Sequence, residues 1–319
     1  MRVAMVQYSP KIGRVQENIN KVTKLCEKLQ PRSIDLLCLP EMAFTGYLFP
    51  NAAAIAPYLE DPHSGPTSRF CAELAARLHC YVVGGFPERL APHEVVEAPD
   101  ANGTPATRIG ANSAVLYDPR GARVGDVYRK THLFETDTTW AKAGTGFATF
   151  TLPSPLGTLA LGICMDLNPQ PPTMWTLAEG PYELAEHCRA RKANVLVLLN
   201  SWLESGWEED DGDDRDSHTI NYWVARLRPL WARNDFGLDT CISGAEAPDE
   251  EGKETLVVIC NRCGEEDGKK FAGSSTLFSM RRDSGRARLL HAMGRRAEGV
   301  EVWTIPSTSG SDARASVAS

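Results

Sequence analysis

Hydrophobic residues along this chain follow two spacings, one typical of buried strands and the other of amphipathic helices. In the first part of the chain, continuous apolar runs predict strands at 3–8, 35–39 and 81–86. Between these runs, apolar residues recur every three or four positions and predict helices at 15–30 and 67–79. Strands that alternate with helices in this way are typical of a sheet covered by helices.

Paired strands are expected in the middle of the chain. The segment 87–111 is rich in Ala, Pro and Gly, and we expect it to form a surface loop. The sequence Pro119-Arg120-Gly121 is a turn signal between two apolar runs, which indicates a hairpin. The strands of this hairpin are predicted at 112–118 and 123–128. A second hairpin is predicted from strands at 147–152 and 158–164.

The second half of the chain repeats the alternation of helices and strands. Helical spacing predicts helices at 182–191 and 219–234. Apolar runs predict further strands at 194–200, 238–243, 255–261, 274–280, 286–291 and 299–305. No change of composition divides the chain, so we expect one domain over 1–306, followed by a small polar tail at 307–319.

Composition and charge narrow the class of protein. Hydrophobic residues make up 42% of the chain and charged residues 24%, which is typical of a globular protein. The 34 basic residues are outnumbered by 41 acidic ones, giving a net charge of −7. This balance argues against nucleic acid or an anionic membrane as a partner.

The cysteines and the first residues indicate a cellular compartment. The nine cysteines are odd in number and lie mostly within apolar segments, as expected of reduced core residues. The opening MRVAMVQYSP reads as a strand and lacks the features of a signal peptide. No apolar run approaches the roughly 20 residues that span a bilayer. We therefore expect a cytoplasmic protein.

Three polar residues stand directly after predicted strands, where α/β folds place their ligands. Glu41 follows a buried strand and a proline; alternatively it is a loop carboxylate paired with an arginine. Lys130 ends a hairpin strand, where a lysine is ordinarily solvated. Cys164 leaves a buried strand and is placed as a nucleophile would be, although a small core residue is the alternative.

Metal sites are not supported by the sequence. Cys260 and Cys263 form a CxxC pair, but no second cysteine or histidine pair with metal-ligand spacing accompanies them. The acidic run 208–216 lacks the ligand spacing of a calcium loop and is expected to be a solvated loop. We expect neither a metal nor a cofactor.

Taken together, Glu41, Lys130 and Cys164 resemble the catalytic residues of the carbon–nitrogen hydrolase, or nitrilase, superfamily. The resemblance covers nearly the whole chain through the blocks VAMVQYSP, LPEMAFTGY, GICMDLNP and VVICNRCGEEDGKKFAGSS. It implies an α/β fold, a four-layer α-β-β-α sandwich. Glu41 would be the general base, Cys164 the nucleophile, and Lys130 would stabilise the oxyanion, with the Met165 N–H as a second donor.

One position of the family pattern is open. Many members carry a second glutamate between the lysine and the cysteine, and this interval offers only Glu135 and Asp137. Neither lies in a family-like motif, so we leave the position unassigned, although Asp137 fits the alignment better.

Within the superfamily, the chain is similar to the eukaryotic N-terminal amidases, which remove the side-chain amide from an N-terminal Asn or Gln for the N-degron pathway. The similarity lies in the segments YRKTH, TDTTW and CMDLNP. It implies protein or peptide N-termini as substrates, and superfamily members often form homodimers. The alternatives are a small aliphatic or ω-amidase and a catalytically silent scaffold.

Recognition of an N-terminal residue requires a partner for its α-ammonium. Asp166 lacks the arginine that many relatives carry two residues later, where this chain has Asn168. Its carboxylate is therefore expected to receive the ammonium, unless it caps the following turn. Trp202 follows the strand at 194–200 and is expected in the pocket wall, with core packing as the alternative; Trp140 is a weaker candidate.

Overall fold

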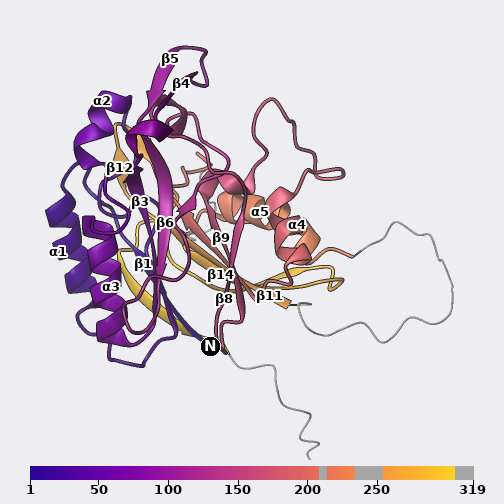
Figure 1. Ribbon diagram of the computed structural model, residues 1–319. Helices are drawn as coiled ribbons and strands as arrows, with labels where there is room; N and C mark the ends of the chain where they lie inside the picture. The colour runs from indigo at the N-terminus through magenta and orange to yellow at the C-terminus, as the bar shows by residue number, and fades with distance from the viewer. Residues whose placement is uncertain (208–213, 234–253, 306–319) are drawn as a thin grey trace, which may run out of the picture.

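The structure is a computed structural model that describes residues 1–207, 214–233 and 254–305 (Figure 1). The strand expected at 238–243 and the tail expected at 307–319 lie outside the described residues. Two six-stranded sheets form the centre of the molecule. Each sheet combines parallel strands at its middle with antiparallel strands at its edges.

The first sheet is built mainly from the N-terminal half of the chain. Its parallel centre is β1, β2 and β3, and the last described strand, β16, returns to pair with β1. In spatial order its strands are β16 (Gly299–Thr304), β1 (Arg2–Gln7), β2 (Leu36–Cys38), β3 (Tyr81–Arg89), β6 (Gly110–Tyr117) and β7 (Tyr128–Arg129).

The second sheet is built from the C-terminal half. Strands β9, β10 and β11 run parallel at its centre. In spatial order its strands are β15 (Ala287–Ala292), β14 (Thr276–Arg281), β11 (Glu254–Asn261), β10 (Val195–Asn200), β9 (Thr158–Ile163) and β8 (Ala148–Thr151).

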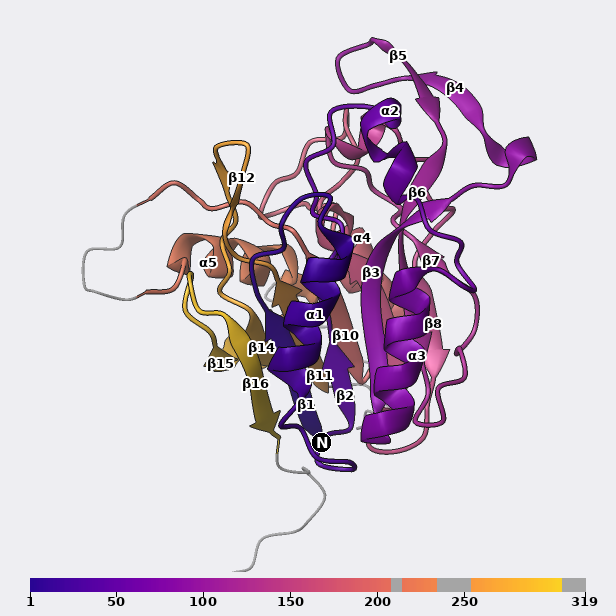
Figure 2. The same ribbon diagram turned by 90° about the vertical axis from the view of Figure 1, so that its left-hand side faces the viewer.

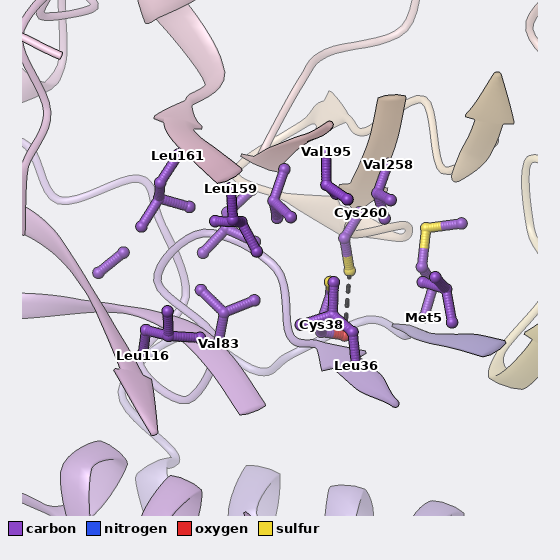
Figure 3. Close-up of a cluster of buried hydrophobic side chains, with 14 of the residues drawn as sticks. Met5, Leu36, Cys38, Val83, Leu116, Leu159, Leu161, Val195, Val258 and Cys260 are labelled. Carbon is purple, nitrogen blue, oxygen red and sulfur yellow. Dashed lines mark hydrogen bonds between the residues drawn. The ribbon is translucent and has the colours of Figure 1, made fainter. Parts of the chain in front are cut away.

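The two sheets pack face to face, with helices on both outer surfaces. Leucine, valine and cysteine side chains from both sheets fill the space between them, as Figure 3 shows around Cys38 and Cys260. The first sheet is covered by α1 (Val15–Cys26) and α3 (Pro66–Leu78), and the second by α4 (Glu183–Ala190) and α5 (Ser217–Arg226) (Figures 1 and 2). The expected four-layer α-β-β-α sandwich is therefore confirmed.

Local sequence signals explain where the helices begin and end. Helix α3 starts with Pro66. Proline has no backbone N–H, and it is tolerated here because an N–H in the first turn of a helix has no partner within the helix. The helix stops at His79, which adopts a left-handed conformation. Helix α5 starts after Asp216, whose carboxylate accepts the Thr219 N–H at 3.0 Å. It is shorter than the expected 219–234, because Pro229 cannot continue the helical hydrogen bonds.

The expectation of a loop at 87–111 was wrong. Strand β3 continues to Arg89, and β4 (Val96–Pro99) and β5 (Pro105–Arg108) form a two-stranded ribbon that projects from the molecule (Figure 2). Seven of the eight residues in its two strands are exposed or half-buried, so the sequence lacks the alternation of apolar and polar residues that marks a strand with one buried face. The short helix α2 (Ala52–Ile55) and the two-residue pair β12 (Glu265–Glu266) and β13 (Lys269–Lys270) were also not expected.

The parallel strands place their carboxyl ends at one edge of the sandwich. Strand β2 of the first sheet and strands β9 and β10 of the second sheet have their carboxyl ends in the same region. A hydrogen bond across the sheets shows this, since the Ser201 N–H, after β10, donates to Glu41, after β2. Polar residues that follow these strands are thereby brought together. Across the described residues, no helix has the length and apolar character needed to cross a membrane.

Candidate active site

Glu41, Lys130 and Cys164 meet at this edge of the sandwich. Glu41 follows β2 through Pro40, Lys130 directly follows β7, and Cys164 opens a 3-10 turn (Cys164–Leu167) after β9. Glu41 and Lys130 are fully buried, and Cys164 is 7% exposed. The two charged groups are therefore shielded from water, whereas the cysteine can be reached. The structure thus brings together the three residues predicted from the sequence.

The Lys130 ammonium lies between two carboxylates. Its Nζ donates to Glu41 Oε1 at 2.7 Å and to Asp137 Oδ2 at 2.6 Å. The Asn112 side-chain amide donates to the same two groups, to Glu41 Oε1 at 2.7 Å and to Asp137 Oδ1 at 3.1 Å. The second oxygen of Glu41 accepts the Ser201 N–H at 2.7 Å. Donors from three separate segments therefore orient the Glu41 carboxylate.

Of the two acidic residues considered for the open position, Asp137 is the one that contacts Lys130. It is fully buried in a 3-10 turn (Asp137–Thr139), while Glu135 points to solvent. Its Oδ2 also accepts from the Phe134 N–H at 3.0 Å and from the Tyr47 hydroxyl at 3.3 Å. Asn112 was not foreseen at all. The available signal was an amide inside a segment predicted to be a strand, since a buried amide needs hydrogen-bond partners.

The charges of the site set its resting protonation state. Burial lowers the pKa of Lys130, but Asp137 and Glu41 together raise that pKa above its ordinary value, so the amine is an ammonium. Burial raises the pKa of Glu41, and Lys130 only partly opposes this rise. A raised pKa makes the Glu41 carboxylate a stronger base than a solvated glutamate.

Cys164 is a neutral thiol at rest. Burial and the negative charge of Glu41 raise its pKa well above the ordinary value, and the nearby Lys130 offsets only part of this. The Lys130 ammonium and the two carboxylates already carry a net charge of about −1. A Cys164 thiolate would add another negative charge to this buried site, which is unfavourable. Lys130 by itself would favour the thiolate, but burial and the negative charge of Glu41 outweigh it. The thiol needs a base to remove its proton.

The backbone of the turn Cys164–Leu167 is strained at its first residue. Cys164 has φ of +44°, a left-handed conformation that a residue with a Cβ rarely adopts. The Asn200 side chain accepts the Cys164 N–H at 3.1 Å, and Arg226 Nε donates to the Leu167 carbonyl at 2.8 Å. These contacts come from β10 and α5, so neighbouring elements hold the turn in place.

A cavity opens above Cys164. Its volume is about 170 Å³, and aromatic and small polar residues form its walls: Tyr47, Phe134, Cys164, Met165, Asn168, Ser201, Trp202 and Leu203. Trp202 thus lies in the wall, where the sequence placed it, and its role in binding stays a prediction. Trp140 is buried in a different hydrophobic cluster and does not line this cavity.

The structure argues against the prediction that Asp166 receives the substrate ammonium. The residue is 1% exposed and lies within the turn Cys164–Leu167. Its Oδ1 accepts the Thr131 and His132 N–H groups at 2.9 and 2.8 Å. Its Oδ2 accepts the Tyr128 hydroxyl at 2.6 Å and the Ile163 N–H at 2.8 Å. A carboxylate oxygen has two lone pairs, so all four acceptor sites are occupied.

Asp166 instead joins the two strand ends that carry the lysine and the cysteine. The two donors of Oδ1 directly follow Lys130, and one donor of Oδ2 directly precedes Cys164. The alternative considered from the sequence, a structural aspartate at this turn, fits the geometry better. The missing arginine two residues later does not free Asp166, because backbone N–H groups and a tyrosine use its oxygens.

The CxxC pair belongs to the packed interior. The Cys260 thiol lies between the two sheets, where it donates to the carbonyls of Val6 at 3.5 Å and Cys38 at 3.3 Å. Cys263 is buried and donates to the Ala297 carbonyl at 3.6 Å. Both cysteines therefore act as small core residues with backbone partners.

Known proteins resemble this chain in sequence and in fold. The family model for carbon–nitrogen hydrolases matches residues 2–178. The chain is 32% identical to a protein N-terminal amidase of Schizosaccharomyces pombe, over 93% of this chain and 96% of that protein. Two solved structures share the fold at 20% identity: an N-terminal amidase with an Asn-Glu peptide (TM-score 0.72) and one with a Gln-Val peptide (TM-score 0.71). In both cases the similarity covers 95% of this chain and 96% of the solved chain.

The role of Asp166 can be tested with Asp166→Asn. An amide in this position presents an NH2 group to two buried donors, which would lose their acceptor. We expect the free energy of unfolding to fall by about 2 kcal/mol or more, since each unsatisfied buried donor costs about 1–3 kcal/mol. Urea unfolding measures this change. A variant with unchanged stability but a selective loss on substrates that carry an α-ammonium would restore the ammonium-binding role.

Proposed function

This chain belongs to the carbon–nitrogen hydrolase family, and we propose that it deamidates N-terminal Asn and Gln of proteins or peptides to Asp and Glu, with release of ammonia. The observation that carries the proposal is the buried Glu41–Lys130–Cys164 group, whose cysteine lines a small cavity. The N-terminal amidase of Schizosaccharomyces pombe supports the choice of substrate, because it is similar over nearly its whole length.

In the first half-reaction, Glu41 takes the proton from the Cys164 thiol as the sulfur attacks the side-chain amide carbon. The tetrahedral intermediate places its negative oxygen against the Lys130 ammonium and the Met165 N–H. Glu41 then returns the proton to the amide nitrogen, the carbon–nitrogen bond breaks and ammonia leaves. The product of this step is a thioester between Cys164 and the substrate side chain.

In the second half-reaction, Glu41 removes a proton from a water molecule, which attacks the thioester carbon. The same oxyanion donors serve again, and the carbon–sulfur bond breaks as Cys164 recovers its proton. One carboxylate can serve both steps because Lys130, Asn112 and Ser201 hold it in one orientation. The neutral resting thiol is consistent with a base that acts at the moment of attack.

The size of the cavity favours a substrate with one short side chain. An apolar cavity of about 150 Å³ can hold a benzene molecule, so the cavity of about 170 Å³ here has room for the side chain of Asn or Gln. A small aliphatic amide or an ω-amide would also fit, which keeps these amidase activities as the alternative. A silent scaffold is disfavoured, since it has no need for the complete charged group.

The substrate's α-ammonium requires a partner other than Asp166. Among the described residues that line the cavity, the available partners are aromatic faces and neutral polar groups rather than a carboxylate. We assign the ammonium to the side of the cavity formed by Trp202, because an indole face attracts a cation. The Trp202 backbone N–H donates to Asn261 Oδ1 at 2.8 Å, which holds the start of this segment in place.

The wider role follows from the chemistry. Deamidation of an N-terminal Asn or Gln creates an acidic N-terminal residue, and we place this step in the N-degron pathway. Its partners would be protein or peptide N-termini in the cytoplasm, with neither nucleic acid nor membrane involved. A homodimer is proposed by resemblance to the superfamily. Ammonia release from Asn- and Gln-initiated peptides, compared with their N-acetylated forms, tests the function and separates it from a general amidase.

Cys164→Ser should abolish turnover and leave the fold intact, because a hydroxyl is far less acidic than a thiol and Glu41 cannot deprotonate it effectively. Ammonia release and thermal unfolding are the measurements. Cys260→Ser is the matched control: it makes the same change in a buried cysteine between the sheets and should remain active. Substantial turnover by folded Cys164→Ser would remove Cys164 as the nucleophile.

Glu41→Gln should lower kcat by at least about 100-fold, the lower range for loss of a general base, because the amide cannot accept a proton in either half-reaction. Glu60→Gln is the control, since Glu60 is a buried carboxylate outside the site whose pKa burial raises to about 7. Because an amide resembles the protonated form of this carboxylate, Glu60→Gln should stay folded and active. Near-normal turnover by Glu41→Gln would assign the base to another group.

The pH profile should have an acid limb set by Glu41. The base must be ionised, so kcat/KM falls as the pH drops through its pKa, and burial places that pKa above the ordinary glutamate value. For a peptide substrate, a second decline is expected near pH 8, about the pKa of an α-amino group. A simple amide should lack this second decline. An acid limb at or below the ordinary glutamate pKa would contradict the raised pKa.

A further inference from the structure

The active-site cavity holds only the first part of the proposed substrate. Its volume of about 170 Å³ suits one side chain, and Cys164 forms part of its wall. A protein or peptide substrate continues beyond its first residue. The residues that follow the N-terminal Asn or Gln must therefore lie on a neighbouring surface.

A second hollow adjoins the cavity and has about twice its volume. It measures about 340 Å³ and shares Trp202 and Leu203 with the cavity, so these two residues form a common wall. Its remaining lining comes from Glu204, Ser205, Trp207, His218, Thr219 and Tyr222. A chain that leaves the cavity across Trp202 enters this hollow directly.

The surface of the hollow is aromatic and partly open to solvent. Trp207 is 65% exposed, and its ring stacks on His218 with 5.3 Å between ring centres and 23° between planes. The Tyr222 ring lies 5.7 Å from that of Trp202. Large exposed aromatic rings beside a reactive site suit contact with another molecule, because they offer a wide apolar area at little cost in side-chain entropy.

The charge of the hollow is compensated. Glu204 forms an ion pair with Arg296 at 2.5 Å, and Arg295 lies 3.8 Å from the same oxygen. The carboxylate is therefore already paired, and this wall does not select a basic substrate residue. Apolar and aromatic side chains are the chemistry that the remaining surface favours.

The segment that separates the cavity from the hollow is held by the main body of the protein. The Glu204 N–H donates to the Lys270 carbonyl at 2.9 Å, and the Ser205 N–H donates to Asp216 Oδ2 at 2.8 Å. Leu203 forms a β-bridge with Phe271. The segment is thus pre-organised for binding, which reduces the entropy lost when a peptide docks.

We propose that this hollow binds the second and third residues of the substrate, and that Trp207 selects apolar or aromatic side chains there. This inference rests on the proposed function. It adds a preference for the sequence that follows the N-terminal Asn or Gln. The Trp207–His218 stack is the contact surface, and Trp202 separates it from the cavity that receives the amide side chain.

The test compares two peptides with the same first residue, Asn-Phe-Phe-amide and Asn-Gly-Gly-amide, by their kcat/KM for ammonia release. Wild type should favour the phenylalanine peptide by roughly 3- to 10-fold, the scale of one aromatic contact. Trp207→Ala should bring the ratio close to one, and Trp207→Phe should restore most of it. Leu289→Ala, which removes an exposed apolar side chain on β15 outside both hollows, should keep the wild-type ratio.

Other outcomes would contradict the role of the hollow, the role of Trp207 or the proposed function. A wild type without the preference, or a Trp207→Ala variant that keeps it, would show that the hollow does not bind these residues. An equal loss on both peptides would assign Trp207 a structural role, and thermal unfolding would show this directly. Release of ammonia from neither peptide by wild type would reject the proposed function and, with it, this inference.

Discussion

The Lys130 ammonium held between Glu41 and Asp137 is the interaction on which the site depends. Burying one positive charge beside two negative ones stabilises the ammonium, and the contacts from Asn112, Tyr47, Ser201 and Phe134 provide further donors that water would otherwise supply. Burial and the negative charge of Glu41 keep the Cys164 thiol neutral, and burial raises the pKa of Glu41 and thus its basicity. The chemistry proposed here therefore follows from a fixed arrangement of charge in a water-poor site.

That arrangement needs two sheets. Glu41 and Lys130 extend from the first sheet, whereas Cys164 and Ser201 extend from the second, and the packed apolar layer between the sheets sets their separation. The left-handed backbone at Cys164 is tolerated because Asn200 and Arg226 hold the turn from both of its ends. Asp166 adds a direct connection, since its two oxygens join the segment after Lys130 to the strand end before Cys164.

We place substrate selection in the aromatic surface around Trp202 and Trp207 rather than in the buried Asp166 carboxylate. The region around Asp166 supports the segments that carry Lys130 and Cys164, and the wall formed by Trp202 faces both the cavity and the neighbouring hollow. There is a physical benefit when the residue that holds the site together is not the one that contacts the substrate. A buried carboxylate with all its lone pairs occupied stays fixed during turnover, whereas exposed aromatic rings can accommodate different peptide sequences.

Much of the fold was determined by the sequence alone, because buried strands and amphipathic helices have local apolar patterns that their own residues carry. The strand and helix order and the three residues Glu41, Lys130 and Cys164 follow from such patterns and from motifs at strand ends. The ribbon at 96–108 was missed, because an exposed pair of strands carries no such pattern. Only the tertiary structure decided that Asp137 completes the charged group, that Asn112 joins it and that Asp166 is saturated. Each of these depends on which donors arrive from distant segments, and a carboxylate looks the same in a sequence whether its lone pairs are free or occupied.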